Sequence, residues 1–359
     1  MKTKRVLLSV TMAALVAASF VHPPAAQAVP EVSNVAKDPT DVPPPIRRSN
    51  AQTVEVELWV EEVVTQIEPG KWAWVWTFNG TVPGPMIRAM EGDTVVVTLN
   101  NYPESCESNP DCVPNQRPHN IDLHAVMGPG GGAAVTNVAV GATRTFSFKA
   151  LRQGAYIYHC AAGAVWEHVA YGMYGLILIE PKGGLKPKGG GFKEFYVGQS
   201  EWYHDVQSSG GRNNLPDDVF ILDRDKAFAE HPSLFTFNGH KNALTNQSLF
   251  GDAILTDQDK MARFFFVNGG PNIGSNWHII GTIFDTVYKG DFKHSESNEE
   301  TVYVPPGSAA VFELSTPVPG RFLIVDHALF RIPKGALGFM YVDPTEDWPD
   351  LIYSPNPAD

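Results

Sequence analysis

The chain has 359 residues, of which 43% are hydrophobic and 18% are charged, and it contains 32 glycines, 29 prolines and three cysteines. This length exceeds what one hydrophobic core usually serves, so we expect two domains. The composition excludes a disordered chain, a coiled coil and a disulfide-dense small scaffold. Frequent glycines and prolines favour many short strands over long helices, and the net charge of −12 disfavours a nucleic-acid partner.

The first 28 residues have the features of a secretory signal peptide. A basic start precedes an apolar stretch of 15 residues from Val6 to Phe20, and Ala26 to Ala28 supply a small-x-small cleavage site. An uncleaved anchor is the alternative, although 15 residues are fewer than the roughly 20 that span a bilayer. We therefore expect a periplasmic or otherwise exported protein that is cleaved after Ala28 and has no membrane span.

Composition divides the rest of the chain into strand-rich segments and connections. Short apolar or alternating runs indicate strands in two long segments, which a stretch rich in glycine and lysine separates. Acidic runs at 201–205 and 217–225 are expected to be solvated loops. The predicted organisation is a signal peptide at 1–28, an extended proline-rich arm at 29–51, a first domain at 52–181, a linker at 182–191, a second domain at 192–345 and a tail at 346–359.

The two long segments repeat each other. Phe78-Asn79-Gly80 recurs as Phe237-Asn238-Gly239, and the run from Gly172 to Pro181 matches the run from Gly335 to Pro344. In both runs a Gly-x-x-Gly pair precedes four mostly apolar residues, an acid and a proline. The repeat predicts an all-β fold of two tandem Greek-key β-sandwich domains.

Residue types that bind copper are concentrated in the first domain. A trigonal His2Cys site with a weak axial methionine needs one thiolate, two imidazoles and one thioether, and His119, Cys160, His168 and Met173 supply them. The alternative is a buried cysteine beside core histidines. Because successive strand residues face opposite sides, His159 must point away from a metal that Cys160 binds. His124 and His159 are therefore predicted to be ligands of a second copper.

The second copper needs a third ligand, and six histidines remain as candidates. They are His204, His231, His240, His278, His294 and His327. The internal repeat favours His327, because it ends the strand equivalent to the one that precedes Cys160; a packed core histidine is the alternative. His278 has the same offset from His119 as the two Phe-Asn-Gly sequences have from each other, so we expect it to have an acid–base role.

Five motifs together resemble the copper-containing nitrite reductases. They are His119-Asn-Ile-Asp122-Leu-His124, Tyr158-His159-Cys160-Ala161, His168-Val-Ala-Tyr-Gly-Met173, His278-Ile-Ile-Gly and Val325-Asp-His327. The stretch HIIGTIFDTVY is similar to the shorter-loop branch of that family, and the resemblance covers about residues 52 to 345.

This resemblance implies two cupredoxin domains, a homotrimer and two coppers per protomer. His119, Cys160, His168 and Met173 match type 1 copper ligands, and His124, His159 and a neighbouring subunit's His327 match type 2 ligands. Asp122 and His278 match a proton-delivering pair, and Ile280 matches an apolar residue over the substrate. The implied activity is the one-electron reduction of nitrite to nitric oxide, with electrons from a c-type cytochrome or a small cupredoxin.

The segment 103–116 departs from the family pattern as an insertion that carries Cys106 and Cys112. In an exported protein we expect these two cysteines to form a local disulfide, with free thiols as the alternative. The insertion precedes His119, so substrate access and donor docking are both candidate roles for it.

Two rival functions are weighed against nitrite reduction. A two-domain multicopper oxidase would need paired His-x-His motifs, and the sequence contains none. A copper protein that only carries electrons would have no use for Asp122, His278 and His327.

Overall fold

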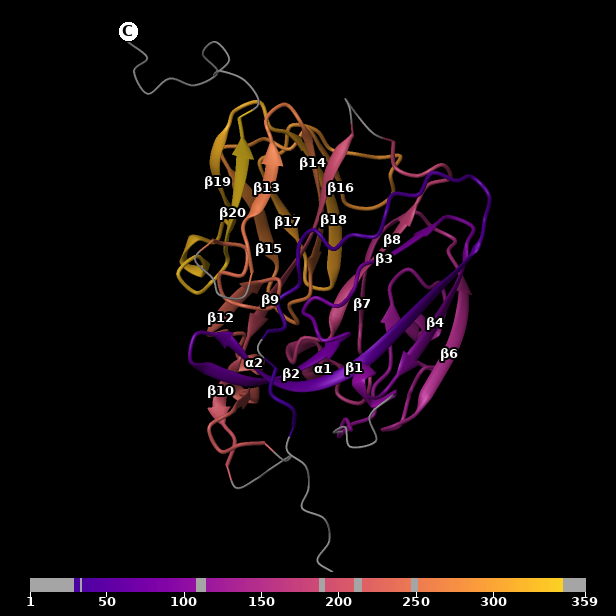
Figure 1. The fold of residues 1–359 in the computed structure, drawn as a ribbon, viewed down its shortest axis with the longest axis vertical. Coiled ribbons are helices and arrows are strands. Elements are labelled where there is room, and N and C mark those ends of the chain that lie inside the picture. Colours follow the sequence, from indigo (N-terminus) through magenta and orange to yellow (C-terminus); the bar gives the residue numbers. More distant parts are fainter. Residues whose placement is uncertain are drawn as a thin grey trace, which may run out of the picture.

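The computed structural model describes residues 29–32, 34–107, 114–186, 191–209, 215–246 and 251–344. The predicted signal peptide and C-terminal tail therefore lie outside the described residues, as does part of the predicted linker. Figure 1 shows two packed groups of strands, the first drawn in indigo to magenta and the second in orange to yellow. The predicted all-β fold of two tandem β-sandwiches is confirmed. Among the described residues, no helix is long and apolar enough to cross a membrane.

The first sandwich pairs a six-stranded sheet with a four-stranded sheet. The larger sheet has the order β10 (His204–Gln207), β11 (Phe220–Leu222), β2 (Lys71–Phe78), β1 (Thr53–Glu68), β4 (Thr94–Asn100) and β6 (Thr143–Lys149). The smaller sheet has the order β3 (Ile87–Met90), β8 (Tyr174–Glu180), β7 (Gly154–His159) and β5 (Asp122–Leu123).

The second sandwich is built from two five-stranded sheets. One has the order β12 (Leu234–Phe237), β9 (Phe192–Trp202), β14 (Met261–Asn268), β18 (Ser308–Ser315) and β16 (Thr286–Tyr288). The other has the order β13 (Ile254–Asp257), β20 (Leu337–Asp343), β19 (Gly320–Asp326), β15 (Ser275–Ile280) and β17 (Thr301–Val304).

In the described part of the chain, helical structure is confined to short segments between strands. They are η1 (Glu104–Glu107), η2 (Pro129–Gly132), α1 (Val165–Ala170), α2 (Arg224–Phe228) and η4 (Leu329–Arg331). Two of them, α1 and η4, lie beside histidines that the sequence marks as candidate ligands.

Strand β2 shows how the sandwiches pack together. Trp74 and Trp76 point into the core of the first sandwich, because alternate residues of a strand face the same side. The intervening Ala73 and Val75 are also fully buried, because their face of β2 belongs to a separate core between the sandwiches. This core includes Val63, Tyr174, Leu176, Tyr196, Trp202, Phe265, Val267 and Val311.

Buried charges also join the two sandwiches. Arg88 on β3 forms an ion pair with Glu180 and lies 2.6 Å from a carboxylate oxygen of Glu194 on β9. Glu194 also lies 2.7 Å from Arg263, which pairs with Glu313 at the same distance. Each charge in this network has an opposite charge within contact, and buried ions require such pairing.

The N-terminal arm runs across both sandwiches. Val64 donates a backbone hydrogen bond to Pro30, and Tyr196 of the second sandwich donates one to Pro39. The arm therefore ties β1 to β9 in the extended form that its prolines predict.

The expectation of a solvated loop is wrong for the acidic run at 201–205, whereas Asp217 and Asp218 of the second run are exposed in a turn, as expected. Glu201 is only 1% exposed and belongs to β9, and the following strands β10 and β11 leave the second sandwich to extend the larger sheet of the first. The register places Phe220 of β11 opposite Ala73 of β2. Asp205 can occupy this half-buried position in β10 because its carboxylate pairs with Lys71 and Lys226.

Candidate metal centres

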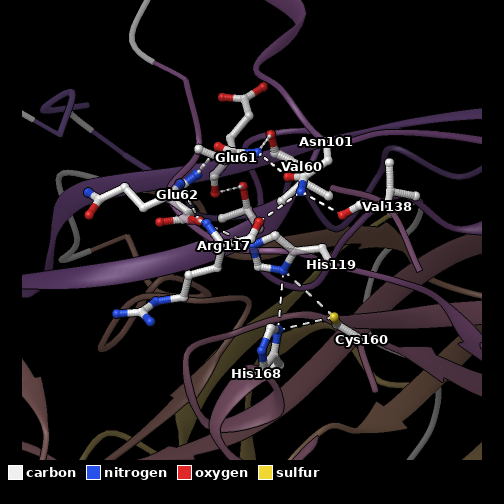
Figure 2. Close-up of polar contacts among 12 residues, drawn as sticks. Val60, Glu61, Glu62, Asn101, Arg117, His119, Val138, Cys160 and His168 are labelled. Atoms are coloured by element: carbon white, nitrogen blue, oxygen red, sulfur yellow. Dashed lines mark hydrogen bonds and ion pairs between the residues drawn. The ribbon is translucent and has the colours of Figure 1, made fainter. Parts of the chain in front are cut away.

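A thiol and two imidazoles converge inside one end of the first sandwich (Figure 2). The Cys160 sulfur lies 3.1 Å from Nδ1 of His168 and 3.7 Å from Nδ1 of His119, and the two Nδ1 atoms are 3.2 Å apart. His119 and Cys160 are fully buried and His168 is 6% exposed. The structure thus brings together three of the four predicted ligands of one metal.

Two connections between strands position these side chains. His119 precedes β5 and forms an isolated bridge with Val138, Cys160 directly follows β7, and His168 lies on α1. The fourth predicted ligand, Met173, is fully buried and accepts a backbone hydrogen bond from Cys160. Its own backbone amide donates to His168, so the loop from Cys160 to Met173 closes on itself around the cluster.

The spacing of the three ligand atoms fits a transition metal. Atoms separated by 3.1–3.7 Å surround a point that lies about 2 Å from each, which is close to the metal–nitrogen and metal–sulfur bond lengths of protein sites. Two imidazoles and one thiolate in a triangle are the donor set of a blue-copper centre with an axial methionine.

The surroundings stabilise the thiolate that such a metal requires. Burial alone would raise the pKa of the Cys160 thiol, but hydrogen bonds and positive charge from His119 and His168 lower it to about 5. Burial would likewise lower the pKa of His119, yet Cys160 and Glu62 raise it to about 9. Cys160 is therefore ready to bind a cation at neutral pH.

Aromatic rings and an asparagine enclose the cluster. The Trp76 ring packs edge-on against His168 and His119, with centroid distances of 4.8 Å and 5.6 Å. Tyr171 stacks on the outer side of Trp76 at 4.1 Å. The backbone amide of Asn120 approaches the Cys160 sulfur at 3.4 Å, the kind of contact that tunes a metal thiolate.

A second cluster lies on the other side of the same strand pair. Strands β5 and β7 place Asp122 directly opposite His159, and Nε2 of His159 lies 3.2 Å from Nε2 of His124. Ligand atoms of Asp122, His124 and His159 all lie within 4.8 Å of one another. His124 is exposed, and its pKa is lowered first by partial burial and then by His159, which favours the neutral imidazole that binds metals.

The two clusters share a peptide bond. His159 ends β7 and Cys160 follows it, and alternation along the strand points their side chains toward different clusters. A covalent path of a few bonds therefore joins a buried thiolate site to an exposed imidazole site.

A glycine-rich turn gives Asp122 its space. Gly131 of η2 has a φ of +53°, and a Cβ placed there would lie 1.9 Å from Oδ1 of Asp122. The run Gly128 to Gly132 is therefore a turn that fits closely over the carboxylate.

The second sandwich contributes a separate histidine pair. The rings of His278 on β15 and His327 after β19 lie 5.2 Å apart. Nδ1 of His278 donates to the Glu300 carbonyl oxygen at 2.6 Å, so its Nε2 is the ring atom left for acid–base chemistry. His327 is exposed and joins neither of the two ligand clusters formed by the described residues. Ile280, at the end of the same strand β15, is 40% exposed.

The other candidate histidines have different surroundings. His204 is fully buried, with Nε2 3.1 Å from the Trp74 carbonyl oxygen, and burial lowers its pKa to about 3. His294 pairs with Asp291 on the surface. Neither metal-ligand cluster found in the described part of the chain includes His204, His231, His240 or His294.

Two acidic residues at the sites were missed by the sequence analysis. Glu62 lies 3.2 Å from Nε2 of His119. Asp326 accepts hydrogen bonds from the backbone amides of Asn276 and Ala328, which lie next to His327. Asp326 could have been suspected because it directly precedes a candidate ligand. Glu62 lies within an apolar strand and no spacing marked it.

Cys106 is disulfide-bonded, and its predicted partner Cys112 lies outside the described residues. Asn115 and Gln116, the last two residues of the same insertion, and the following Arg117 donate hydrogen bonds to Val60 and Glu62 of β1.

Comparison with known proteins shows the family. A family model described as multicopper oxidase matches residues 60–184. A copper-containing nitrite reductase from Neisseria meningitidis serogroup A is 42% identical over 325 residues, which cover 90% of this chain and 78% of that protein. The chain belongs to the copper-containing nitrite reductases.

More distant nitrite reductases support the same assignment. A copper-containing nitrite reductase from Cereibacter sphaeroides is 33% identical, with 85% of this chain and 82% of that protein covered. A solved copper nitrite reductase from Nitrosomonas europaea superposes with a TM-score of 0.68 and 30% identity, covering 82% of this chain and 95% of that one. The predicted family and its cupredoxin architecture are confirmed.

Proposed function

We propose that this nitrite reductase family member converts nitrite, one electron and two protons to nitric oxide and water. The observation that carries the proposal is the His159–Cys160 peptide, which joins a buried thiolate cluster to an exposed histidine cluster beside a carboxylate. A pure electron carrier would need only the buried cluster.

Two coppers per protomer fit these residues. His119, Cys160, His168 and Met173 would hold a type 1 copper, and His124 and His159 would hold a type 2 copper together with a third imidazole. When bound, copper supplies one-electron redox chemistry at the first site and, at the second, a positive charge that holds nitrite against an acidic surface.

The protein's own groups would manage the protons. Asp122 lies within 4.8 Å of the ligand atoms of His124 and His159, where its carboxyl group can give a proton to a nitrite oxygen that leaves as water. His278 would supply the second proton from Nε2, because the Glu300 carbonyl holds Nδ1–H. Ile280 would present an apolar face to the substrate.

The third imidazole would come from His327 of a neighbouring copy in a homotrimer. Within the described residues of one chain, His327 is not grouped with His124 and His159. It is followed by the exposed apolar side chains of Leu329 and Phe330, which are 54% and 91% exposed. An exposed apolar patch beside a ligand suits an interface between copies.

The surroundings of the enzyme follow from charge and the N-terminal sequence. We propose export to the periplasm with cleavage after Ala28, which removes three cations and gives a net charge of −15. A basic c-type cytochrome or a small cupredoxin would suit this surface as electron donor. The partner of Cys106 is proposed to be Cys112, and mapping disulfide-linked peptides under non-reducing conditions tests that pairing.

The central experiment measures nitric oxide release from nitrite with a reduced dye, alongside oxygen uptake and copper content. We expect nitrite-dependent nitric oxide and two coppers per protomer. Oxygen uptake with four coppers would indicate a multicopper oxidase, and one copper without turnover would indicate an electron carrier.

Sharing of the second site between copies has its own test. His124→Ala and His327→Ala each remove a ligand, so either homotrimer should lose type 2 copper. Co-expression of the two variants would produce mixed trimers in which some sites contain no altered residue. Recovery of part of the activity on mixing supports the shared site, and no recovery in verified mixed trimers contradicts it.

A further inference from the structure

A buried carboxylate touches the far side of one metal-binding imidazole (Figure 2). Glu62 on β1 is 3% exposed, and its Oε1 atom lies 3.2 Å from Nε2 of His119. The opposite ring nitrogen of His119, Nδ1, faces Cys160 and His168. The imidazole therefore lies between the carboxylate and the cluster.

We propose that Glu62 is a positioning residue that fixes the tautomer of His119 and sets the reduction potential of the type 1 copper. The inference rests on the proposed function only in requiring copper at the buried cluster. When Nε2–H donates to Glu62, the lone pair of Nδ1 faces the metal position. A neutral residue at position 62 would remove the charge that strengthens this ligand.

The carboxylate is held in place by the segment that carries His119. Oε1 of Glu62 also accepts the backbone amides of Gln116 at 2.9 Å and Arg117 at 3.0 Å. Its second oxygen, Oε2, is buried without a hydrogen-bond partner among the described residues. Three donors therefore meet on the one oxygen that contacts His119, which defines the direction of the carboxylate.

Asn115 joins β1 to the segment that precedes His119. Asn115 accepts a hydrogen bond from the Glu62 backbone amide and donates to the carbonyl of Val60 at 2.8 Å. It also donates to the side chain of Asn101, which in turn donates to the carbonyl of Arg117. Because the network involves β1, the residue that follows β4 and the loop before His119, Glu62 cannot turn away without breaking several buried hydrogen bonds.

The charge of Glu62 favours the more positive oxidation state of a nearby metal. Oxidised copper carries one more positive charge than reduced copper, and a buried carboxylate attracts that extra charge through a medium of low dielectric. Removal of the carboxylate should therefore make the copper easier to reduce. Replacement of partners of this kind typically costs 10- to 100-fold in metal affinity or activity, and we expect an effect at the lower end of this range on the redox equilibrium.

The test compares two adjacent glutamates in the full-length copper enzyme. Glu62→Gln removes the charge but keeps an oxygen that can accept from His119. Glu61→Gln removes the same charge one residue earlier on β1, where the side chain points to the opposite side of the strand toward Gly80. Redox titration of the blue absorption, against a dye of known potential, measures the equilibrium between oxidised and reduced type 1 copper in each variant.

We expect Glu62→Gln to shift this equilibrium about 10-fold toward the reduced form, which is a rise of about 59 mV for one electron. Glu61→Gln should shift it by less than a third of that in millivolts. Equal shifts in the two variants, or a fall in potential for Glu62→Gln, would overturn the positioning role.

A second variant covers the case in which Glu62→Gln does not fold. Glu62→Asp keeps the charge but withdraws it by one methylene, so a smaller rise in potential is expected and an unchanged potential counts against the proposal. The wild-type protein separates the two levels of inference. If it has no blue absorption when loaded with copper, the proposed function fails; if it is blue and the variants match the control, only the role of Glu62 fails.

Discussion

The two histidine clusters share a peptide bond but differ in almost every other respect. His119, Cys160 and His168 are at most 6% exposed and come from one chain, whereas His124 is exposed and its cluster lacks a third imidazole among the described residues. In our proposal, the buried cluster exchanges only electrons, which cross protein without an opening. The exposed cluster would admit a substrate and a neighbouring subunit. The different burial of the two clusters therefore matches what each one would exchange, which is electrons at the buried cluster and substrate at the exposed one.

The clusters also differ in how charge is balanced. In the buried cluster, the thiolate, two imidazoles and Glu62 compensate one another, so the site is ordered before a metal arrives. In the second cluster, His124 is exposed and Asp122 and His159 are half-buried, so solvent reaches the ligand atoms. The buried site is thus defined by charges that pair with one another inside the protein. The exposed site is defined by the ligand atoms that remain free to bind a substrate.

The sharpest test of this division is Asp122→Asn. We expect turnover of nitrite to fall by about 10²–10⁴-fold, because an amide cannot donate the proton that a carboxyl group delivers. Blue absorption and copper content should stay at wild-type values, since the change lies outside the buried cluster. Unchanged turnover would remove Asp122 from the mechanism, and loss of the blue colour would show that the clusters are not independent.

Glu201, outside both clusters, tests whether a buried carboxyl group without an opposite charge keeps its proton. It is 1% exposed, accepts hydrogen bonds from the amides of Asn272 and Ile273 and from the Tyr203 hydroxyl, and forms no ion pair with any described residue. Burial raises its pKa from 4.5 to about 7. The folded protein therefore keeps this proton over a range in which the unfolded chain has already lost it.

The sign of the resulting pH dependence follows from linkage. The contribution of Glu201 to stability is complete below pH 4.5 and is lost as the pH rises to about 7. The glutamine of Glu201→Gln does not titrate. As the pH rises from 4.5 to about 7, the free energy of unfolding of this variant should therefore increase by about 3 kcal/mol relative to that of the wild type. Urea denaturation at a series of pH values measures the gain. A constant difference would mean that the buried carboxylate is balanced by a charge.

A third change addresses how the open cluster is completed. Asp326 is fully buried, pairs with Arg331 and accepts hydrogen bonds from the amides of Asn276 and Ala328, which flank His327 in space and in sequence. Asp326→Asn should weaken binding of the second copper by about 10- to 100-fold. Competition with a copper chelator measures the affinity, with Asp291→Asn as the control. Equal affinities in the two variants would exclude this role.

The smallest expected effect belongs to Ile280→Val. Ile280 is 40% exposed, so removal of one methylene should change kcat/KM for nitrite by no more than about 10-fold. Steady-state kinetics with nitrite give the value. An effect as large as that of Asp122→Asn would mean that shape, and not proton delivery, dominates the open cluster.

The residues of the two clusters could be predicted from sequence because their signals are local. Cys160, His168 and Met173 lie in one loop, and strand alternation alone separates His159 from Cys160. The two sandwiches could be predicted because glycine, acid and proline punctuate equivalent strands. These signals depend on neighbours in the chain, which a single sequence displays.

The features that were missed depend on contacts between distant segments. Glu62 becomes a partner of His119 only because the segment 115–117 folds back on β1, and an acid within an apolar strand indicates nothing about its partner. The run at 201–205 looked solvated because Lys71, a cation that pairs with Asp205, is far away in sequence. Long-range pairing of charges is invisible to local composition.

The path of β10 and β11 has a consequence for how the chain acquires its structure. Strand β2 pairs with β11, which is made almost 150 residues later, so the larger sheet of the first sandwich cannot be completed early in synthesis. Such non-local pairing slows folding, and a fragment that ended at the linker would present β2 as an open edge inviting aggregation. The half of the molecule that holds the thiolate is therefore not a self-sufficient cupredoxin to which a second half was added. Its larger sheet can be completed only after β10 and β11, which follow the second domain's first strand, have been synthesised.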